Sequence, residues 1–225
     1  MVAARLHGTV YRALTAVGNV VLALPRDAAA AALPQLWQLL YSLCSSLTSH
    51  IELEEACRQL PAEAGVSAGP AGEMPSLLAT TTRTVAALLR RAEEDKISLP
   101  ITESHVQSMV GVVSSALEPE ARANATACVA TMARLPGAPP AMVQAAANVI
   151  ATASADAHPL VVAEAAHGAM DGFADEHVEE YARAELGARL GAAASKLTAL
   201  VQRGRAVELL DERIVEAAVN LPRFL

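Results

Sequence analysis

Apolar residues along this chain recur every three or four positions, which is the spacing of one face of an α-helix. In the segment Thr102–Leu117, for example, Val106, Met109 and Val113 lie on one such face. Nothing alternates with a period of two over enough residues to predict a strand. The pattern predicts about ten helices, at Ala3–Leu24, Leu33–His50, Ile51–Ala62, Pro75–Glu94, Thr102–Leu117, Pro119–Leu135, Pro140–Ser154, Pro159–Phe173, Glu176–Arg203 and Leu209–Leu221.

The residues between these segments agree with helix boundaries. Pro119, Pro140 and Pro159 stand where a first helical residue is expected, a position at which the missing N–H costs nothing. Thr102 is a suitable N-cap, because its hydroxyl oxygen can accept a bond from the first turn. The Gly/Pro-rich stretch from Pro61 to Pro75 predicts a flexible loop at about 61–75.

The predicted helices repeat in pairs. First helices of successive pairs begin near Thr102, Pro139 and Glu176, about 37 residues apart, and second helices begin near Pro119 and His158. Helix pairs at such an interval are the signature of stacked repeats, because each pair has a face that it cannot bury alone. The sequence therefore predicts an all-α fold, an α-solenoid of HEAT- or armadillo-like antiparallel helix pairs, as a single domain over residues 1–225.

Composition excludes several classes of protein. The chain is 53% hydrophobic and 18% charged, so disorder over most of its length is excluded, and the 3% of aromatic residues predicts a core of small aliphatic side chains. The formal net charge of −7 argues against direct nucleic-acid binding, which needs a basic surface, and is compatible with a basic protein partner. No segment has the roughly 18 uncharged apolar residues of a membrane span.

The cysteines and the N-terminus bear on the compartment. Cys44, Cys57 and Cys128 are odd in number and far apart, which indicates reduced core thiols in an intracellular protein. The first 26 residues carry three arginines and no acid, as a mitochondrial transit peptide does. The apolar stripe Leu6, Val10, Leu14, Val17 and Val21 favours instead the first helix of the fold.

Two motifs resemble catalytic or metal sites. Gly65–Gly69 matches G-x-S-x-G around Ser67, but that motif works only on a turn from a strand into a helix, and this stretch has the composition of a linker. His167 and Asp171 are four residues apart on one helix and could begin a metal site, although no third ligand follows at a suitable spacing. An exposed His–Asp pair near a helix end is the favoured interpretation.

Three asparagines lie within predicted helices. Asn19, Asn124 and Asn148 are candidates for buried amides that bond neighbouring turns, and simple exposure is an equal alternative for Asn124. Asn124 also begins a formal glycosylation sequon, which we interpret as accidental because it lies inside a helix.

Five acidic residues gather where one predicted helix ends and the next begins: Asp171, Asp175, Glu176, Glu179 and Glu180. Carboxylates at the start of a helix stabilise its N-terminal dipole, which accounts for Asp175, Glu176 and Glu179 without any function. The functional alternative is an acidic lip that recruits a basic partner. Acid–base catalysis would need a cleft, which the sequence does not indicate.

The same corner carries a family resemblance. The stretch "AAHGAMDGFADE" and the terminal "LLDERIVEAAVNLPRFL" resemble the C-terminal end of the symportin family, and "YRALTAVGNVVLAL" and "LPQLWQLLYSL" are similar to helices of the same region. Pro222 departs from the family's ending and predicts an early end to the last helix. The matching positions are Asp171, Phe173, Ala174, Asp175, Asn220, Leu221, Arg223 and Phe224.

The resemblance implies a function and a place in a longer chain. Symportins are armadillo/HEAT-repeat adaptors that escort the ribosomal proteins binding 5S rRNA into the nucleus, and they have no catalytic residues or cofactors. The resemblance covers the C-terminal HEAT-repeat part, so this chain would be a portion of a longer solenoid or a shortened member.

The sequence therefore favours a non-enzymatic scaffold in the cytoplasm and nucleus. Its expected partners are basic ribosomal proteins of the large subunit and an import receptor, with no direct nucleic acid and no membrane. Alternatives are a generic HEAT-repeat interaction module in another transport or assembly complex, an enzyme using Ser67 or the His167–Asp171 pair, and a mitochondrial protein.

Overall fold

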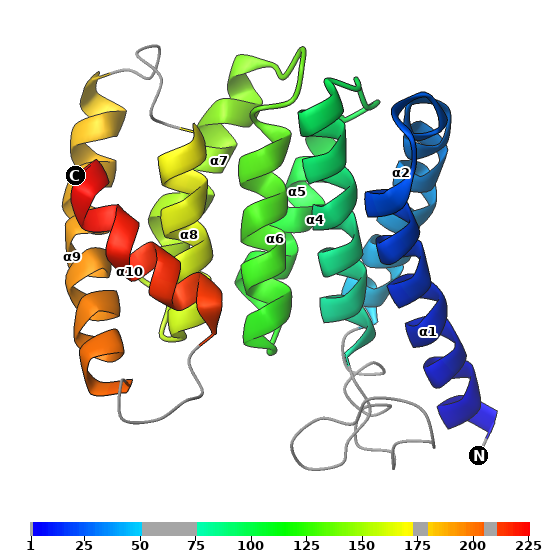
Figure 1. Ribbon diagram of the computed structural model, residues 1–225, viewed down its shortest axis with the longest axis horizontal. Helices are drawn as coiled ribbons and strands as arrows, with labels where there is room; N and C mark the ends of the chain where they lie inside the picture. Colours follow the sequence, from blue (N-terminus) through cyan, green and yellow to red (C-terminus); the bar gives the residue numbers. More distant parts are fainter. Residues whose placement is uncertain (1, 51–75, 173–179, 205–210) are drawn as a thin grey trace.

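The computed structural model describes residues 2–50, 76–172, 180–204 and 211–225. Every element in these ranges is a helix, as the periodicity predicts (Figure 1). The helices are α1 (Val2–Ala23), α2 (Arg26–Ser49), α4 (Leu77–Asp95), α5 (Glu103–Ser115), α6 (Pro119–Met132), α7 (Pro140–Ala153), α8 (Pro159–Gly172), α9 (Glu180–Gly204) and α10 (Glu212–Phe224). The helix predicted at Ile51–Ala62 and the loop at about 61–75 lie outside the described residues.

The helices form two layers, and the stack follows the order of the sequence (Figure 1). Helices α1, α4, α6 and α8 lie side by side in one layer, and α10 crosses obliquely against α8 and α9. Helices α2, α5, α7 and α9 form the other layer. The predicted pairs α5/α6, α7/α8 and α9/α10 are in contact, which confirms the solenoid of repeats.

Most helix starts follow the predicted chemistry. Pro119, Pro140 and Pro159 are the first residues of α6, α7 and α8. Thr102 is the N-cap of α5, where its backbone N–H donates to Nδ1 of His105 at 2.8 Å. The predicted start of the last helix at Leu209 is wrong, because Asp211 is the N-cap of α10 and its carboxylate accepts the N–H of Arg213 at 3.0 Å.

Two prolines lie inside helices, contrary to the predicted boundaries. Helix α2 begins at Arg26 rather than Leu33 and contains Pro34. Proline removes one helical hydrogen bond, and here the orphaned carbonyl belongs to Ala30, an exposed residue that water can reach. Pro222 does not end α10 early, because the helix continues to Phe224 and the N–H of Leu225 still reaches the carbonyl of Leu221 at 3.2 Å.

The core runs between the two layers as two adjoining clusters of small and aliphatic side chains. Helix α6 packs against α4, α5, α7 and α8, so its valine, its methionine and all of its alanines except the half-buried Ala127 are buried. The free thiols of Cys44 and Cys128 are buried, as predicted, and burial raises the pKa of Cys44 to about 12. Cys57 lies outside the described residues.

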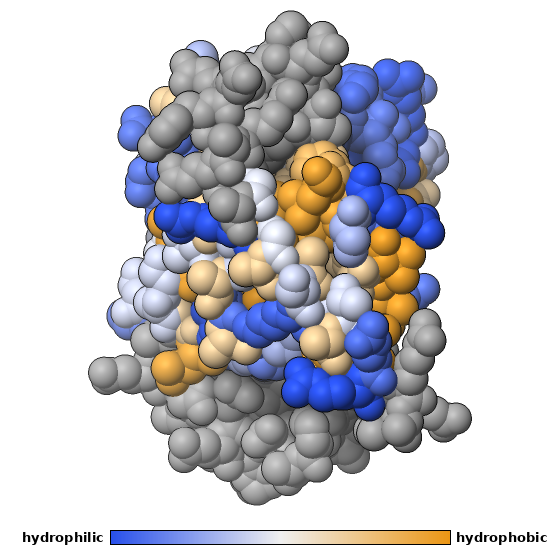
Figure 2. All heavy atoms as spheres, turned by 90° about the vertical axis from the view of Figure 1, so that its left-hand side faces the viewer, coloured by the Kyte–Doolittle hydropathy of each residue, from blue (hydrophilic) through white to orange (hydrophobic). Residues whose placement is uncertain are grey.

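The ends of the stack leave apolar side chains uncovered. Figure 2 shows the C-terminal end, where hydrophobic surface lies between hydrophilic patches. The exposed large apolar residues of α10 are Val215, Val219 and Phe224, and Leu225 directly follows them. At the other end Leu6 of α1 is 65% exposed, so its predicted place on the buried stripe is wrong, although Leu14 and Val21 are buried. Among the described helices, none is long and apolar enough to span a membrane.

Candidate binding groove

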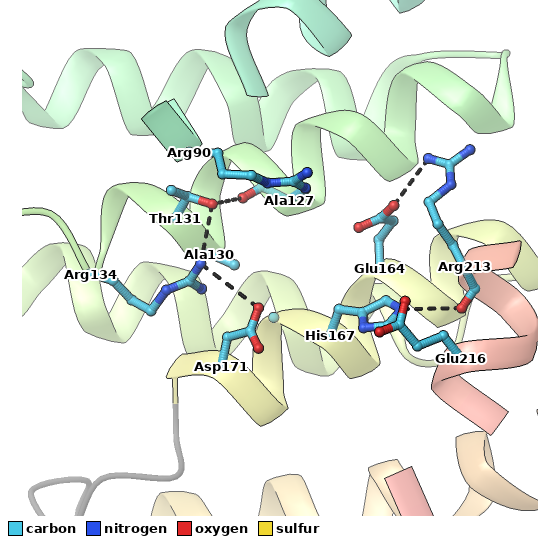
Figure 3. Close-up of a pocket in the computed structure, with 11 residues that line it drawn as sticks. Arg90, Ala127, Ala130, Thr131, Arg134, Glu164, His167, Asp171, Arg213 and Glu216 are labelled. Atoms are coloured by element: carbon cyan, nitrogen blue, oxygen red, sulfur yellow. Dashed lines mark hydrogen bonds and ion pairs between the residues drawn. The ribbon is translucent and has the colours of Figure 1, made fainter. Parts of the chain in front are cut away.

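A groove of about 360 Å³ opens on the layer that contains α4, α6, α8 and α10. Its floor consists of small side chains, namely Ala127, Ala130 and Thr131 of α6 and Gly168 of α8. A Cβ atom added to Gly168 would lie 2.8 Å from Cβ of Ala130, so α6 and α8 approach more closely than any larger residue would allow. The groove exists because small residues form the floor while long charged side chains form its edges (Figure 3).

Two of the three arginines at the edges are already paired. Arg134, after α6, donates to both carboxylate oxygens of Glu93 on α4, with Nε–Oε1 at 2.7 Å and Nη2–Oε2 at 3.1 Å. Arg213 of α10 donates from Nη1 to Glu164 of α8 at 3.0 Å and forms a two-point pair with Asp211 at 3.0 and 2.8 Å. The Arg134–Glu93 and Arg213–Glu164 pairs connect neighbouring helices of the stack and fix the groove's edges, whereas the Arg213–Asp211 pair lies within the start of α10.

The Arg213–Asp211 pair affects the protonation of both groups. The hydrogen bonds from Arg213 lower the pKa of Asp211, and those to Asp211 raise the pKa of Arg213. Glu164 is only 10% exposed and depends on Arg213 for its countercharge. Asp211 and Arg213 therefore stay charged at neutral pH, and a ligand in the groove would have to compete with a pair that is already formed.

Three charged groups of the groove remain open to a ligand. Arg90 of α4 and Glu216 of α10 are exposed and form no ion pair with any described residue. Asp171 of α8 is 63% exposed and lies 4.0 Å from Nη2 of Arg134, at the outer limit of an ion pair. Asp171 is thus the one residue of the predicted acidic corner whose side chain the structure describes, and it lies in the groove.

The other members of the acidic corner are not tested. Asp175, Glu176 and Glu179 lie outside the described residues, and the structure describes only the backbone of Glu180, at the start of α9. The role of the corner as a protein-binding site stays a prediction.

His167 also lines the groove, but not in the way that its spacing suggests. Its Nε2–H donates to the carbonyl oxygen of Arg213 at 3.1 Å, while Asp171 faces Arg134 (Figure 3). The predicted exposed His–Asp pair is therefore wrong: His167 is half-buried and ties α8 to α10. Within the described ranges no group of three or more His, Cys, Asp or Glu is placed to hold a metal. Ser67 lies outside these ranges.

The asparagines divide between the two alternatives. Asn124 is buried, and its Nδ2 donates to the carbonyl of Ala79 on α4 at 3.1 Å. Asn19 and Asn148 are exposed, so their prediction as buried amides is wrong.

The sequence did not reveal five charged residues of the groove, because these residues meet only when repeats stack: Arg90, Arg134, Glu164, Arg213 and Glu216. A 37-residue interval between Arg134 and Asp171, or between Ala127 and Glu164, is the signal that could have aligned them.

Stacked helix pairs with a groove across one layer define a helical-repeat protein, a class whose members act as scaffolds. Over residues 1–225 the chain matches the family described as SYO1-like, TPR repeats, so it belongs to the SYO1, or symportin 1, family. No curated protein and no solved structure matched it. The repeat interval of about 37 residues lies between the roughly 34 of TPR and 40–47 of HEAT repeats.

Proposed function

We propose that this chain is a protein-binding scaffold that acts as a nuclear-import adaptor and chaperone for basic large-subunit ribosomal proteins. The observation that carries the proposal is membership of the SYO1-like family over the whole chain, together with the residues that resemble symportins. Its working compartments would be the cytoplasm and the nucleus, and its second partner an import receptor.

Charge supports a basic client. At a net charge of −7 the chain attracts cationic proteins over distances comparable to the Debye length, which raises association rates and weakens with salt. An acidic chaperone surface can also cover the lysines and arginines of a client until ribosomal RNA replaces it.

The direct test is capture of purified basic large-subunit ribosomal proteins by the immobilised chain at about 0.05 M and 0.3 M salt. We expect specific retention at low salt that weakens at high salt, with an acidic protein of similar size passing through at both. Absence of retention at low salt would reject the ribosomal client.

A specific feature also supports the broader alternative, a helical-repeat module of another transport or assembly complex. The groove is not uniformly acidic, since Arg90, Arg134 and Arg213 line it as well as Glu164, Asp171 and Glu216. Identification of the partners that co-purify with the tagged chain from cells distinguishes the two functions.

A further inference from the structure

The open charges of the groove lie on opposite walls. We define the α4 wall by Arg90 and the α8/α10 wall by Asp171 and Glu216, with the small residues of α6 as the floor between them (Figure 3). The remaining charged side chains of the groove are paired within the protein. A ligand therefore meets one cation on one side and two carboxylates on the other.

The dimensions of the groove suit a short extended peptide. Glu164 and Asp171, which bound its edge on α8, are seven residues apart, a rise of about 10 Å. Three residues of an extended chain cover about 10 Å. The small floor of α6 also lets a backbone lie close to the helix without a steric clash, as the backbone of α8 does at Gly168, where there is no room for a Cβ beside Ala130.

The spacing of the carboxylates suits alternate side chains of such a peptide. His167 bonds the carbonyl of Arg213, and Glu216 lies three residues further along α10, so Glu216 belongs to the His167 end of the wall. His167 and Asp171 are four residues apart on α8, about 6 Å of rise, and residues i and i+2 of an extended chain are about 6.6 Å apart.

Side chains of an extended chain point alternately to opposite sides. We propose that the groove binds an extended segment of alternating charge, with basic side chains at i and i+2 on Asp171 and Glu216 and an acidic side chain at i+1 on Arg90. The inference rests on the proposed function in taking the occupant to be a segment of a protein client. It adds that recognition depends on the charge pattern of the segment and not on its net positive charge.

The test compares two fluorescent nine-residue peptides with identical Gly/Ser flanks and the central sequences Lys-Asp-Lys and Lys-Lys-Lys. Binding to the full chain is followed by fluorescence anisotropy at about 0.15 M salt. Because exposed ion pairs are each worth a few tenths to about 1 kcal/mol, we expect the wild type to bind Lys-Asp-Lys about three- to fivefold more tightly.

Charge reversal at the α4 wall should reverse this preference. In Arg90→Glu the Lys-Lys-Lys peptide should bind more tightly, whereas Arg12→Glu, an exposed arginine of α1 outside the groove, should keep the wild-type order. The double variant Asp171→Asn/Glu216→Gln should weaken both peptides, and its matched control Asp27→Asn/Glu103→Gln, on the other layer, should not.

The same peptide order in the wild type and in Arg90→Glu would overturn the inference, and so would tighter binding of Lys-Lys-Lys to the wild type. Capture of whole ribosomal proteins, run in parallel, separates this failure from that of the proposed function. If the ribosomal proteins bind but the peptides show no dependence on Arg90, only the alternating pattern is lost. If Arg90→Glu reverses the order of the two peptides but no ribosomal protein binds, the ribosomal client is rejected, and the groove's preference for alternating charge still holds.

Discussion

Helix α6 meets its two neighbours in the same layer through different kinds of surface. Toward α4 it uses buried polar groups: Asn124 donates to the carbonyl of Ala79, and the thiol of Cys128 lies 3.6 Å from the carbonyl of Thr82. Toward α8 it uses small side chains, with Ala130 facing Gly168. One contact is fixed by hydrogen bonds to backbone carbonyls and the other by close packing.

The difference has a consequence for the binding groove. The small residues that let α6 pack closely on α8 also form the floor of the groove and make it deep. The polar contact between α6 and α4 sets the position of the α4 wall, which carries Arg90. Changes at the α6–α8 contact should therefore act mainly through steric overlap, and changes at the α6–α4 contact through the loss of buried hydrogen bonds.

The largest effect is expected at the close contact. Gly168→Ala places a Cβ 2.8 Å from that of Ala130, and overpacking of this kind costs about 1–3 kcal/mol of unfolding free energy. The change should destabilise the protein although alanine is the better helix former. Urea denaturation followed by circular dichroism measures it.

Two controls sharpen that prediction. The double variant Gly168→Ala/Ala130→Gly lacks the opposing methyl group and should regain part of the stability that Gly168→Ala loses. Gly191→Ala on α9 meets no atom within 4 Å and should stabilise by about 0.5–1 kcal/mol. A stabilising Gly168→Ala would show that α6 and α8 are not in close contact.

A loss of similar or smaller size is expected at the polar contact. Asn124→Ala removes a buried hydrogen bond between α6 and α4 and leaves the space of the amide empty, which together should cost about 1–3 kcal/mol, although the carbonyl of Ala79 still accepts from Thr82 Oγ1 at 3.0 Å. Asn148→Ala, at an exposed helical position, should change the free energy of unfolding by less than about 0.5 kcal/mol. Equal effects of the two substitutions would argue against the hydrogen bond between α6 and α4.

Ion pairs should rank next, according to burial. Arg122 donates to both carboxylate oxygens of Asp156 at 3.1 Å and to the carbonyls of Ala116 and Leu117, and its side chain is 17% exposed. Arg122→Ala should cost about 1–3 kcal/mol in the same denaturation experiment. The side chain of Arg83 is 58% exposed and lies 3.7 Å from Glu120. Arg83→Ala should therefore lower the free energy of unfolding by less than about 0.5 kcal/mol.

The smallest effect concerns pH. Burial lowers the pKa of His105, whose Nδ1 accepts the N–H of Thr102, and burial together with Arg122 lowers the pKa of His158. The unfolded chain, with histidine pKa values near 6.5, takes up protons first as the pH falls, so these two residues should make stability decline as pH drops below about 6.5. The stability difference between pH 7.5 and pH 5.5 should be smaller in His105→Gln/His158→Gln. An unchanged difference would contradict the assignment.

The fold could be predicted from local signals, whereas the groove could not. Periodicity and the prolines at 119, 140 and 159 indicated the helices and their stacking, because these signals act within one helix or one turn. Pro34 and Pro222 gave wrong boundaries, since packing of the whole helix outweighs one lost hydrogen bond. Arg90, Glu164 and Glu216 come together only across repeats, and no local pattern records which exposed charges will face each other.

Asp171 is the one predicted site residue that the structure places in the groove, and the reason is positional; its role in protein binding stays a prediction. It lies at the end of α8, where the acidic corner begins, and the stacking places it at the groove's edge. His167 was predicted on the right helix with the wrong partner, because the carbonyl that it binds belongs to α10. That this chain is the C-terminal portion of a longer solenoid stays a prediction.

The most direct test of the account fills the groove without disturbing the core. Ala127 lines the floor and is half-buried, so Ala127→Trp should occupy the groove while the circular dichroism spectrum and melting temperature remain close to those of the wild type. Isothermal titration with a basic large-subunit ribosomal protein should then show at least about tenfold weaker binding, the loss of about 1.4 kcal/mol. Unchanged affinity in a folded Ala127→Trp variant would show that the client binds elsewhere.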